Sequence, residues 1–201
     1  SLLEHAGLPV FVVQGDEGNI KITRPGDMTL AAGLLQGEDM MKIGHGFDAH
    51  RLVEGRELVL GGVAIDFDRG LLGHSDADVL THALIDAILG AAGAGDIGSH
   101  FPDSDERYHG ISSIRLLEET VTLAAQGGLQ LANGDLTILC QRPRLAPHLA
   151  AMRENLAAAC RVAPDRINIK ATTTEQMGYT GRGEGIAAHA VVLLRPAPSR
   201  T

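Results

Sequence analysis

The chain has 201 residues, of which 44% are hydrophobic and 3% aromatic, with 25 glycines and no tryptophan. This length suits one domain of ordinary size, and the composition predicts a core of small aliphatic side chains joined by many tight turns. The formal net charge of -8 provides no general attraction to nucleic acid or to an anionic membrane, so we expect neither as a partner. No apolar run reaches the ~18 residues of a membrane span, the N-terminus has no signal-peptide pattern, and Cys140 and Cys160 form no CxxC motif; together these features favour a cytoplasmic protein.

Residues 1–40 differ in character from the rest of the chain. Segments 8–14 and 19–23 predict short strands, and segment 28–35 predicts a short helix after a Pro-Gly turn. A segment of this length buries too little surface to fold alone. We therefore interpret it as the remnant and linker of an N-terminal domain, followed by a second domain over residues 41–201.

From Met41 onward, strand and helix patterns are mixed. Strands are predicted at 42–47, 58–65 with an interruption at Gly61-Gly62, 136–140, 167–171 and 187–194. Helices are predicted at 78–92, 113–126 and 147–160, the last with Pro147 in its first turn. This order favours the α/β class, an α+β sandwich in which a mixed sheet carries its helices on one face.

One cluster of residues has the spacing of metal ligands. Asp48 and His50 are two apart in a predicted extended segment and would point to the same side. His82 lies on the predicted helix 78–92, with Asp86 one turn further along. Three protein ligands with an open position are typical of catalytic zinc, and Asp86 could orient a neighbouring ligand. The alternative is that His82 is a buried, hydrogen-bonded histidine and Asp48 caps a turn.

Two loops have the composition of phosphate sites. Residues 74–78, HSDAD, offer a hydroxyl, carboxylates and free N–H groups at a helix start, although plain capping by Ser75 or Asp76 explains them as well. Residues 170–175, KATTTE, offer consecutive hydroxyls for phosphate oxygens and a carboxylate for Mg²⁺, although β-branched threonines could simply extend the strand.

Two other polar loops are less specific. The glycine-rich run 178–185 contains Arg182, which could form paired hydrogen bonds with a phosphate, or the run could be a surface turn. Residues 96–103 could bind substrate hydroxyls or form a capped turn. The residues alone do not decide either case.

Three segments are distinctive when taken together: IGHGFDAHR, LLGHSDADVLTHALIDAILGAAGAGDIGSHFPD and IKATTTEQMGYTGRGEGIAAHA. With them, residues 41–195 resemble the 2-C-methyl-D-erythritol 2,4-cyclodiphosphate synthase family along nearly their whole length. Residues 1–40, with GDEGNIKITRPGDMTLA, resemble the C-terminal end of 2-C-methyl-D-erythritol 4-phosphate cytidylyltransferase, as in the bifunctional fusion enzyme.

The resemblance implies roles for matching positions. Zn²⁺ would bind Asp48, His50 and His82, and Mg²⁺ or Mn²⁺ would bind Glu175 together with the substrate diphosphate. Thr173, Glu175 and Asp86 are expected to act in catalysis. Contacts with the substrate are expected from His74, Ser75, Asp96, Gly98, Phe101, Asp103, Cys140, Arg144, Leu145, Ala171, Thr172, Thr173 and Arg182.

The implied reaction converts 4-diphosphocytidyl-2-C-methyl-D-erythritol 2-phosphate to the cyclic diphosphate with release of CMP, in non-mevalonate isoprenoid precursor biosynthesis. The family also implies a homotrimer with a central cavity that can hold an isoprenoid diphosphate, lined by Phe47 and Arg182. His189 stands where some relatives have a carboxylate, which puts that ligand in doubt. The rival functions are a hydrolase that lets water attack and a non-catalytic module that binds cytidine nucleotides or a terpenoid.

Overall fold

The computed structural model describes residues 5–7, 20–35, 41–102 and 104–197. The chain divides into two compact units, Ser1–Asp39 and Met40–Thr201. In neither unit do the described residues form a helix that is both long and apolar enough to cross a membrane.

The first unit contains helix α2, Pro25–Leu35. It begins three residues before the predicted start, because the Asp27 carboxylate accepts the N–H groups of Thr23 and Arg24 at 2.7 and 2.8 Å and fixes the first turn. The predicted strand 19–23 is wrong over its described part, since residues 20–23 lead into this cap instead of pairing. The predicted strand 8–14 lies outside the described residues.

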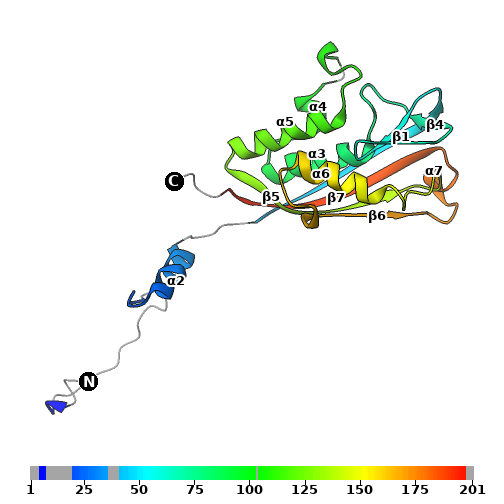
Figure 1. The fold of residues 1–201 in the computed structure, drawn as a ribbon. Helices are drawn as coiled ribbons and strands as arrows, with labels where there is room; N and C mark the ends of the chain where they lie inside the picture. The colour runs from blue at the N-terminus through cyan, green and yellow to red at the C-terminus, as the bar shows by residue number, and fades with distance from the viewer. Residues whose placement is uncertain (1–4, 8–19, 36–40, 103, 198–201) are drawn as a thin grey trace. The chain divides into compact units, whose positions relative to one another are not determined.

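The second unit is built on a five-stranded mixed sheet in the order β4-β1-β7-β5-β6 (Figure 1). β5 and β6 are parallel, and the other neighbours are antiparallel. The strands are β4 Arg69–Leu71, β1 Lys42–Glu54, β7 Gly185–Pro196, β5 Leu129–Leu139 and β6 Ile167–Thr172.

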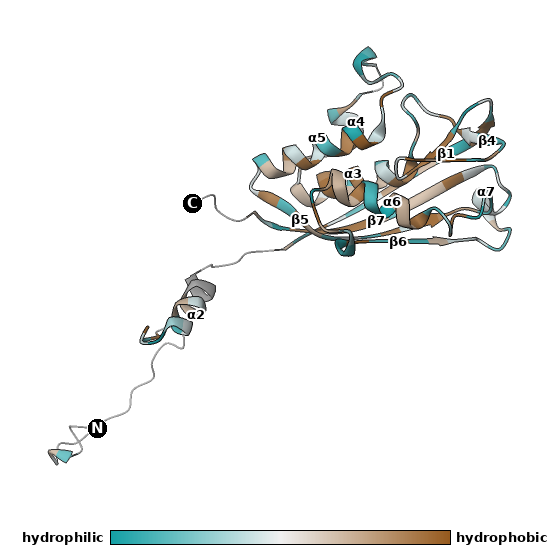
Figure 2. Cartoon of the chain, in the orientation of Figure 1, coloured by the Kyte–Doolittle hydropathy of each residue, from teal (hydrophilic) through white to brown (hydrophobic). Residues whose placement is uncertain are grey.

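Three helices cover one face of this sheet: α3 Val79–Ala92, α5 Ser113–Gln126 and α6 Leu149–Ala159 (Figure 1). α3 contacts β1, β7 and α5, and most of its residues are buried, which agrees with its largely hydrophobic colouring in Figure 2. The predicted mixed sheet with helices on one face is therefore confirmed.

Two glycines of β1 allow α3 to lie directly on the sheet. A Cβ at Gly44 would lie 1.8 Å from the carbonyl oxygen of Ala87, and one at Gly46 would lie 1.9 Å from that of Ala83. Both distances are impossible for a side chain, so only glycine permits this approach. The contact places the middle of α3 beside the middle of β1, where the candidate metal ligands lie.

The opposite face of the sheet carries apolar side chains that the helices do not cover. Ile43 is 71% exposed, Phe47 47% and Val191 46%. They come from β1 and β7, whose registers pair Ile43 with Leu193 and Phe47 with His189. An exposed apolar group of this kind marks a surface for another molecule.

Several predicted boundaries need correction. The single strand predicted at 58–65 is a hairpin of β2 Leu58–Leu60 and β3 Val63–Ile65, because Gly61 and Gly62 have φ of 56° and 68° and form its turn. α6 begins at Leu149, so Pro147 precedes the helix instead of lying in its first turn. The remaining short elements are β4, α4 Ile97–His100, α7 Gly178–Gly181 and the 3-10 turns η1 Glu106–Tyr108 and η2 Pro164–Arg166, none of which was predicted.

Candidate active site

Asp48 and His50 of β1 meet His82 of α3. The Oδ2 atom of Asp48 lies 2.9 Å from Nδ1 of His82 and 3.1 Å from Nε2 of His50. One ligand atom from each of the three residues lies within 4.8 Å of the others. Two imidazole nitrogens and a carboxylate oxygen form a donor set that suits Zn²⁺. The structure thus brings together all three residues expected to bind it.

The charges within this triad depend on one another. Burial alone would raise the pKa of Asp48, but hydrogen bonds from His50 and His82 outweigh burial and hold that pKa well below its usual range. Burial alone would lower the pKa of His82, but the hydrogen bond and negative charge of Asp48 raise it instead. The site therefore favours positive charge next to Asp48, which a divalent cation would also supply.

The second ring nitrogen of His82 faces two hydroxyls. Its Nε2 atom lies 2.8 Å from Oγ of Ser113 and 3.3 Å from Oγ of Ser75. Ser113 is fully buried at the start of α5, where its N–H donates to Oδ2 of Asp76 at 2.9 Å and its hydroxyl donates to Oδ1 of the same carboxylate. Ser113 was not predicted at the site.

The triad lies in the wall of a cavity of about 380 Å³. This cavity brings together much of the predicted machinery from β1, the loop before α3, α3 itself and α4. The predicted residues that line it are Asp48, His50, His74, Ser75, His82, Asp86, Gly98 and Phe101. Ile97 and Pro102, from the loop 96–103, also line it. Gly73, Tyr108 and Leu116 complete the lining, and no sequence signal marked these three as site residues.

Asp86 and Asp96 both position the short helix α4. Burial raises the pKa of Asp86, which accepts the N–H of Ile97 at 2.8 Å. Asp96 is exposed and caps α4, accepting the N–H of Ser99 at 2.8 Å and its hydroxyl at 2.6 Å. Asp96 does not line the cavity, so its contact with substrate stays a prediction, and Asp103 lies outside the described residues.

A second cavity of about 660 Å³ lies where the parallel strands β5 and β6 end. The N–H of Cys140 donates to the carbonyl of Thr172 at 3.0 Å and joins the two strand ends. Burial raises the pKa of Cys140 to about 11, so this thiol is neutral and unreactive at neutral pH. The predicted residues that line this cavity are Cys140, Arg144, Leu145, Ala171, Thr172 and Thr173.

The loop after β6 holds Glu175 in a fixed conformation. The hydroxyl of Thr173 donates to Oε1 of Glu175 at 2.7 Å, and Glu175 itself has a φ of 50°. Thr174 Oγ lies 2.9 Å from the hydroxyl of Thr180 and donates to the carbonyl of Met177 at 2.7 Å. The Glu175 side chain remains exposed. Within the described part of the chain, no residue lines both this cavity and that of the triad.

The residues expected in a central cavity lie at two different places. Phe47 and His189 are neighbours on the open sheet face, with ring centroids 4.8 Å apart, and Nδ1 of His189 lies 3.2 Å from Nε2 of His45. Arg182 is exposed at the end of α7, where it forms an ion pair with Glu184 at 2.7 Å.

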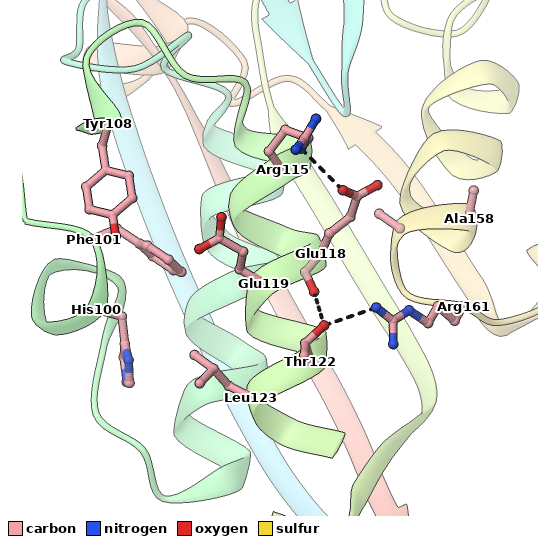
Figure 3. A pocket seen from close by; sticks show the side chains of 11 residues that line it. His100, Phe101, Tyr108, Arg115, Glu118, Glu119, Thr122, Leu123, Ala158 and Arg161 are labelled. Atoms are coloured by element: carbon pink, nitrogen blue, oxygen red, sulfur yellow. Dashed lines mark hydrogen bonds and ion pairs between the residues drawn. The ribbon is translucent and has the colours of Figure 1, made fainter. Parts of the chain in front are cut away.

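A third cavity, of about 710 Å³, shares Phe101 and Tyr108 with the triad's cavity (Figure 3). These two rings meet edge to face with centroids 5.4 Å apart, and both belong to the lining of each cavity. The other lining residues include Arg115, Glu118 and Arg161, and none of them is among the residues expected at the site.

Comparison with known proteins identifies the family of this chain. A model of the YgbB family matches residues 41–195. The chain is 57% identical over 199 residues to a protein of Desulfotalea psychrophila named bifunctional enzyme IspD/IspF, covering 97% of this chain and 52% of that protein. It is 63% identical over 158 residues to a protein of Syntrophotalea carbinolica named 2-C-methyl-D-erythritol 2,4-cyclodiphosphate synthase, covering 79% of this chain and 96% of that protein.

A solved structure gives the same result for the fold. The IspF structure of Plasmodium falciparum in complex with CDP matches with a TM-score of 0.69 at 29% identity, covering 80% of this chain and 99% of that one. The chain spans about half the length of the bifunctional relatives that it matches. The resemblance expected from the three distinctive segments is confirmed, and the chain belongs to the YgbB family.

Proposed function

We propose that this chain converts 4-diphosphocytidyl-2-C-methyl-D-erythritol 2-phosphate to 2-C-methyl-D-erythritol 2,4-cyclodiphosphate and CMP. The observation that carries the proposal is the Asp48, His50 and His82 triad, which opens into a cavity together with His74 and Ser75. The name of the relative that is 63% identical supports the same reaction.

Asp48, His50 and His82 would hold one Zn²⁺ per chain through one oxygen and two nitrogens. Glu175, with Thr173 bonded to it, would hold Mg²⁺ or Mn²⁺ in part, because such ions keep waters and bind substrate phosphates as well. When bound, the two ions would supply positive charge to the phosphate oxygens.

The chain's own residues would then fold the substrate back on itself. His74 and Ser75 would orient the 2-phosphate, and Thr172 and Thr173 would hold the diphosphate. One oxygen of the 2-phosphate forms a bond to the β-phosphorus, and the bond from that phosphorus to the bridging oxygen breaks as CMP leaves. Water is not consumed. Both reacting groups belong to one substrate, so positioning supplies much of the rate.

The two cavities would provide different parts of the substrate site. The erythritol portion would face Gly98 and Phe101, together with Asp86, which lines the same cavity. Asp96 and Asp103, which are close to Gly98 and Phe101 in sequence, would also face it. The cavity that contains Cys140, Arg144, Leu145 and Ala171 would receive the cytidine. The CDP in the Plasmodium falciparum structure supports a cytidine nucleotide as ligand.

We further propose a homotrimer in which each active site is shared by two chains. The support is twofold. The triad lines one cavity of the chain, and Thr172 and Thr173, in the segment 172–175 that we call the threonine loop, line another. An apolar sheet face is also exposed. A closed threefold ring would cover that face and bring one chain's triad to the next chain's threonine loop. Phe47, His189 and Arg182 would then line a central space that could receive an isoprenoid diphosphate.

We interpret residues 1–40 as similar to the C-terminal end of a cytidylyltransferase domain, which the match to the bifunctional relatives supports. The buried, unpaired state of both cysteines supports a cytoplasmic location.

Phosphorus NMR of the purified chain with substrate, Zn²⁺ and Mg²⁺ tests the proposed reaction. We expect the two coupled resonances of a cyclic diphosphate together with CMP. Open-chain phosphates would instead identify a hydrolase, and unchanged substrate would indicate a module that only binds nucleotides. Either result contradicts the proposal.

A further inference from the structure

We propose that Asp76 and Ser113 form a hydrogen-bond relay that determines which nitrogen of His82 is available to a metal ion. This inference rests on the proposed metal site and adds two positioning residues to it. Asp76 was considered above only as a cap or an anion contact, and Ser113 had no predicted role.

The direction of each hydrogen bond follows from the number of hydrogens. Ser113 has one hydroxyl hydrogen, and the Asp76 carboxylate, which has no hydrogen to offer, lies at hydrogen-bonding distance from that hydroxyl. The hydroxyl therefore donates to Asp76. Nε2 of His82 lies 2.8 Å from the same Ser113 oxygen, which can now only accept from it. His82 must therefore carry a hydrogen on Nε2. The hydrogen on Nδ1, which Asp48 accepts, is then the one that a metal ion would displace, and its loss leaves the Nδ1 lone pair for the ion.

Nδ1 is the atom that the metal needs. It lies 2.9 Å from Oδ2 of Asp48, on the side of the ring that faces the triad. Metal-binding histidines in general donate their other ring N–H to an oxygen that fixes the tautomer. Here that oxygen is a serine hydroxyl, and the carboxylate lies one bond further away.

The other neighbour of Nε2 is a weaker candidate for this role. Oγ of Ser75 lies 3.3 Å from Nε2, against 2.8 Å for Ser113, and it already accepts the N–H of Ala77 at 3.1 Å. Ser113 is also fully buried, whereas Ser75 is 8% exposed and lines the cavity. Ser75 is thus available to substrate while Ser113 holds the ring.

The relay also links the metal site to helix α5. Asp76 accepts both the backbone N–H and the hydroxyl of Ser113, so it satisfies one of the free N–H groups at the start of α5. The loop before α3 and the first turn of α5 are 37 residues apart in sequence and meet at this carboxylate. A shift of α5 would therefore move the oxygen that orients His82.

Two substitutions test the relay in different ways. Ser113→Ala removes the oxygen that accepts from His82. Asp76→Asn keeps the size of the side chain but can turn an N–H toward the serine oxygen, which frees the serine hydrogen to point at Nε2 and favours the tautomer that cannot bind a metal through Nδ1. Ser112→Ala is the matched control, because Ser112 is exposed and its side chain makes no capping bond. Ser113→Thr retains the hydroxyl and should restore binding.

The measurement is the Zn²⁺ affinity of the full chain, obtained by competition with a chromophoric chelator, with thermal unfolding of each metal-free variant as the check on folding. We expect Ser113→Ala and Asp76→Asn to bind Zn²⁺ about 10–100-fold more weakly, with Ser112→Ala and Ser113→Thr close to the parent. In the zinc-loaded parent, proton NMR should also detect a slowly exchanging hydrogen on Nε2 of His82, which both relay variants should lose.

The outcomes separate the relay from the site on which it rests. If the parent chain binds no Zn²⁺, the proposed metal site is wrong and the relay is wrong with it. If the parent binds Zn²⁺ and the folded Asp76→Asn and Ser113→Ala variants bind it within twofold of the parent, the metal site stands and the relay is overturned. If a variant does not fold, the other variant and the Nε2 hydrogen of the parent decide the question.

Discussion

At the scale of single residues, Asp48 shares one carboxylate oxygen between two histidines. Its Oδ2 contacts His50 and His82, while Oδ1 accepts the N–H of Ala49 at 2.8 Å. A half-buried carboxylate in this arrangement is stable only beside positive charge, which protonated imidazoles or a cation can provide. The affinity for a metal ion should therefore depend on each of the three side chains.

We predict that His82→Ala loses Zn²⁺ and activity while the fold survives. Loss of a hydrogen-bond partner of a metal ligand typically weakens metal binding by about 10–100-fold. Loss of a ligand itself should therefore weaken Zn²⁺ binding by more than ~100-fold. Metal analysis of the purified variant measures zinc per chain, and thermal unfolding checks the fold. His100→Ala is the control, because His100 bonds to the carbonyl of Ala94 outside the triad. Zinc retained near one per chain in His82→Ala would contradict the assignment.

Substitution of Glu175 should change the requirement for the second metal ion and leave Zn²⁺ binding unchanged. Glu175→Gln keeps an oxygen for the Thr173 hydroxyl but removes the charge that a divalent ion requires. We expect the variant to need at least about 10-fold more Mg²⁺ for half-maximal activity, with zinc content unchanged. Activity measured against Mg²⁺ concentration gives this value, and Glu154→Gln on the exposed surface of α6 is the control. An unchanged Mg²⁺ requirement would remove Glu175 from the site.

At the scale of elements, the contact between β1 and α3 positions the triad. Asp48 and His50 are fixed by the pairing of β1 with β7, and His82 is fixed by the place where α3 crosses β1. Gly44 and Gly46 allow that crossing. A change that separates the two elements should therefore damage the metal site without touching a ligand.

Gly46→Ala makes that change. Its Cβ would lie 1.9 Å from the carbonyl oxygen of Ala83, so backbone must move, and we expect a loss of stability of about 1–3 kcal/mol or more together with weaker Zn²⁺ binding. Gly134→Ala is the matched control in β5 of the same sheet, because its Cβ would meet ordinary contacts at 3.5 Å and beyond. Thermal unfolding and zinc analysis of the two variants decide the matter. Equal behaviour of both would show that α3 tolerates the displacement.

The sequence predicts helices better than strands in this chain. The segment 113–126 has the bounds of α5, and Asp78 is the cap of α3, because amphipathic spacing and capping are local signals. β1, β5 and β7 run several residues further than predicted, through segments such as Asn133-Gly134-Asp135 that favour turns. Pairing with β7 on one side and β6 on the other overrides that local preference.

The site residues that local sequence patterns mark were predicted, and those brought in by distant contacts were not. The triad is predictable because a period of two aligns Asp48 with His50, and the polar stripe of α3 presents His82. The contact of Ser113 with Asp76 depends on where α5 begins relative to the loop before α3, which no local pattern encodes. Tyr108 and Leu116 reach the cavity for the same reason and were missed.

At the scale of the whole molecule, the triad and the threonine loop of one chain line separate cavities, and an apolar sheet face is exposed. A ring of three copies would pair each triad with a neighbour's threonine loop. Two inactive variants that fail at different half-sites should therefore restore each other when they share a ring.

We predict that His82→Ala and Glu175→Ala, each nearly inactive alone, recover activity when unfolded, mixed and reassembled. Every mixed trimer has one interface that joins an intact triad to an intact loop, so about one site in three becomes active in it. Turnover per chain measures this recovery, and native mass spectrometry verifies the mixed trimers. Mixing His82→Ala with His50→Ala is the control, because both lack the same half-site. Mixed trimers without activity would mean that each chain works alone.

In the proposed reaction, a phosphate of the substrate, and not water, attacks the β-phosphorus. Turnover in water enriched in ¹⁸O, followed by mass spectrometry of both products, tests this directly, since only attack by water places a solvent oxygen in a product. We predict a cyclic diphosphate and CMP that both lack ¹⁸O. An ¹⁸O atom in CMP, or in an open-chain phosphate formed at the enzyme's rate, would contradict it.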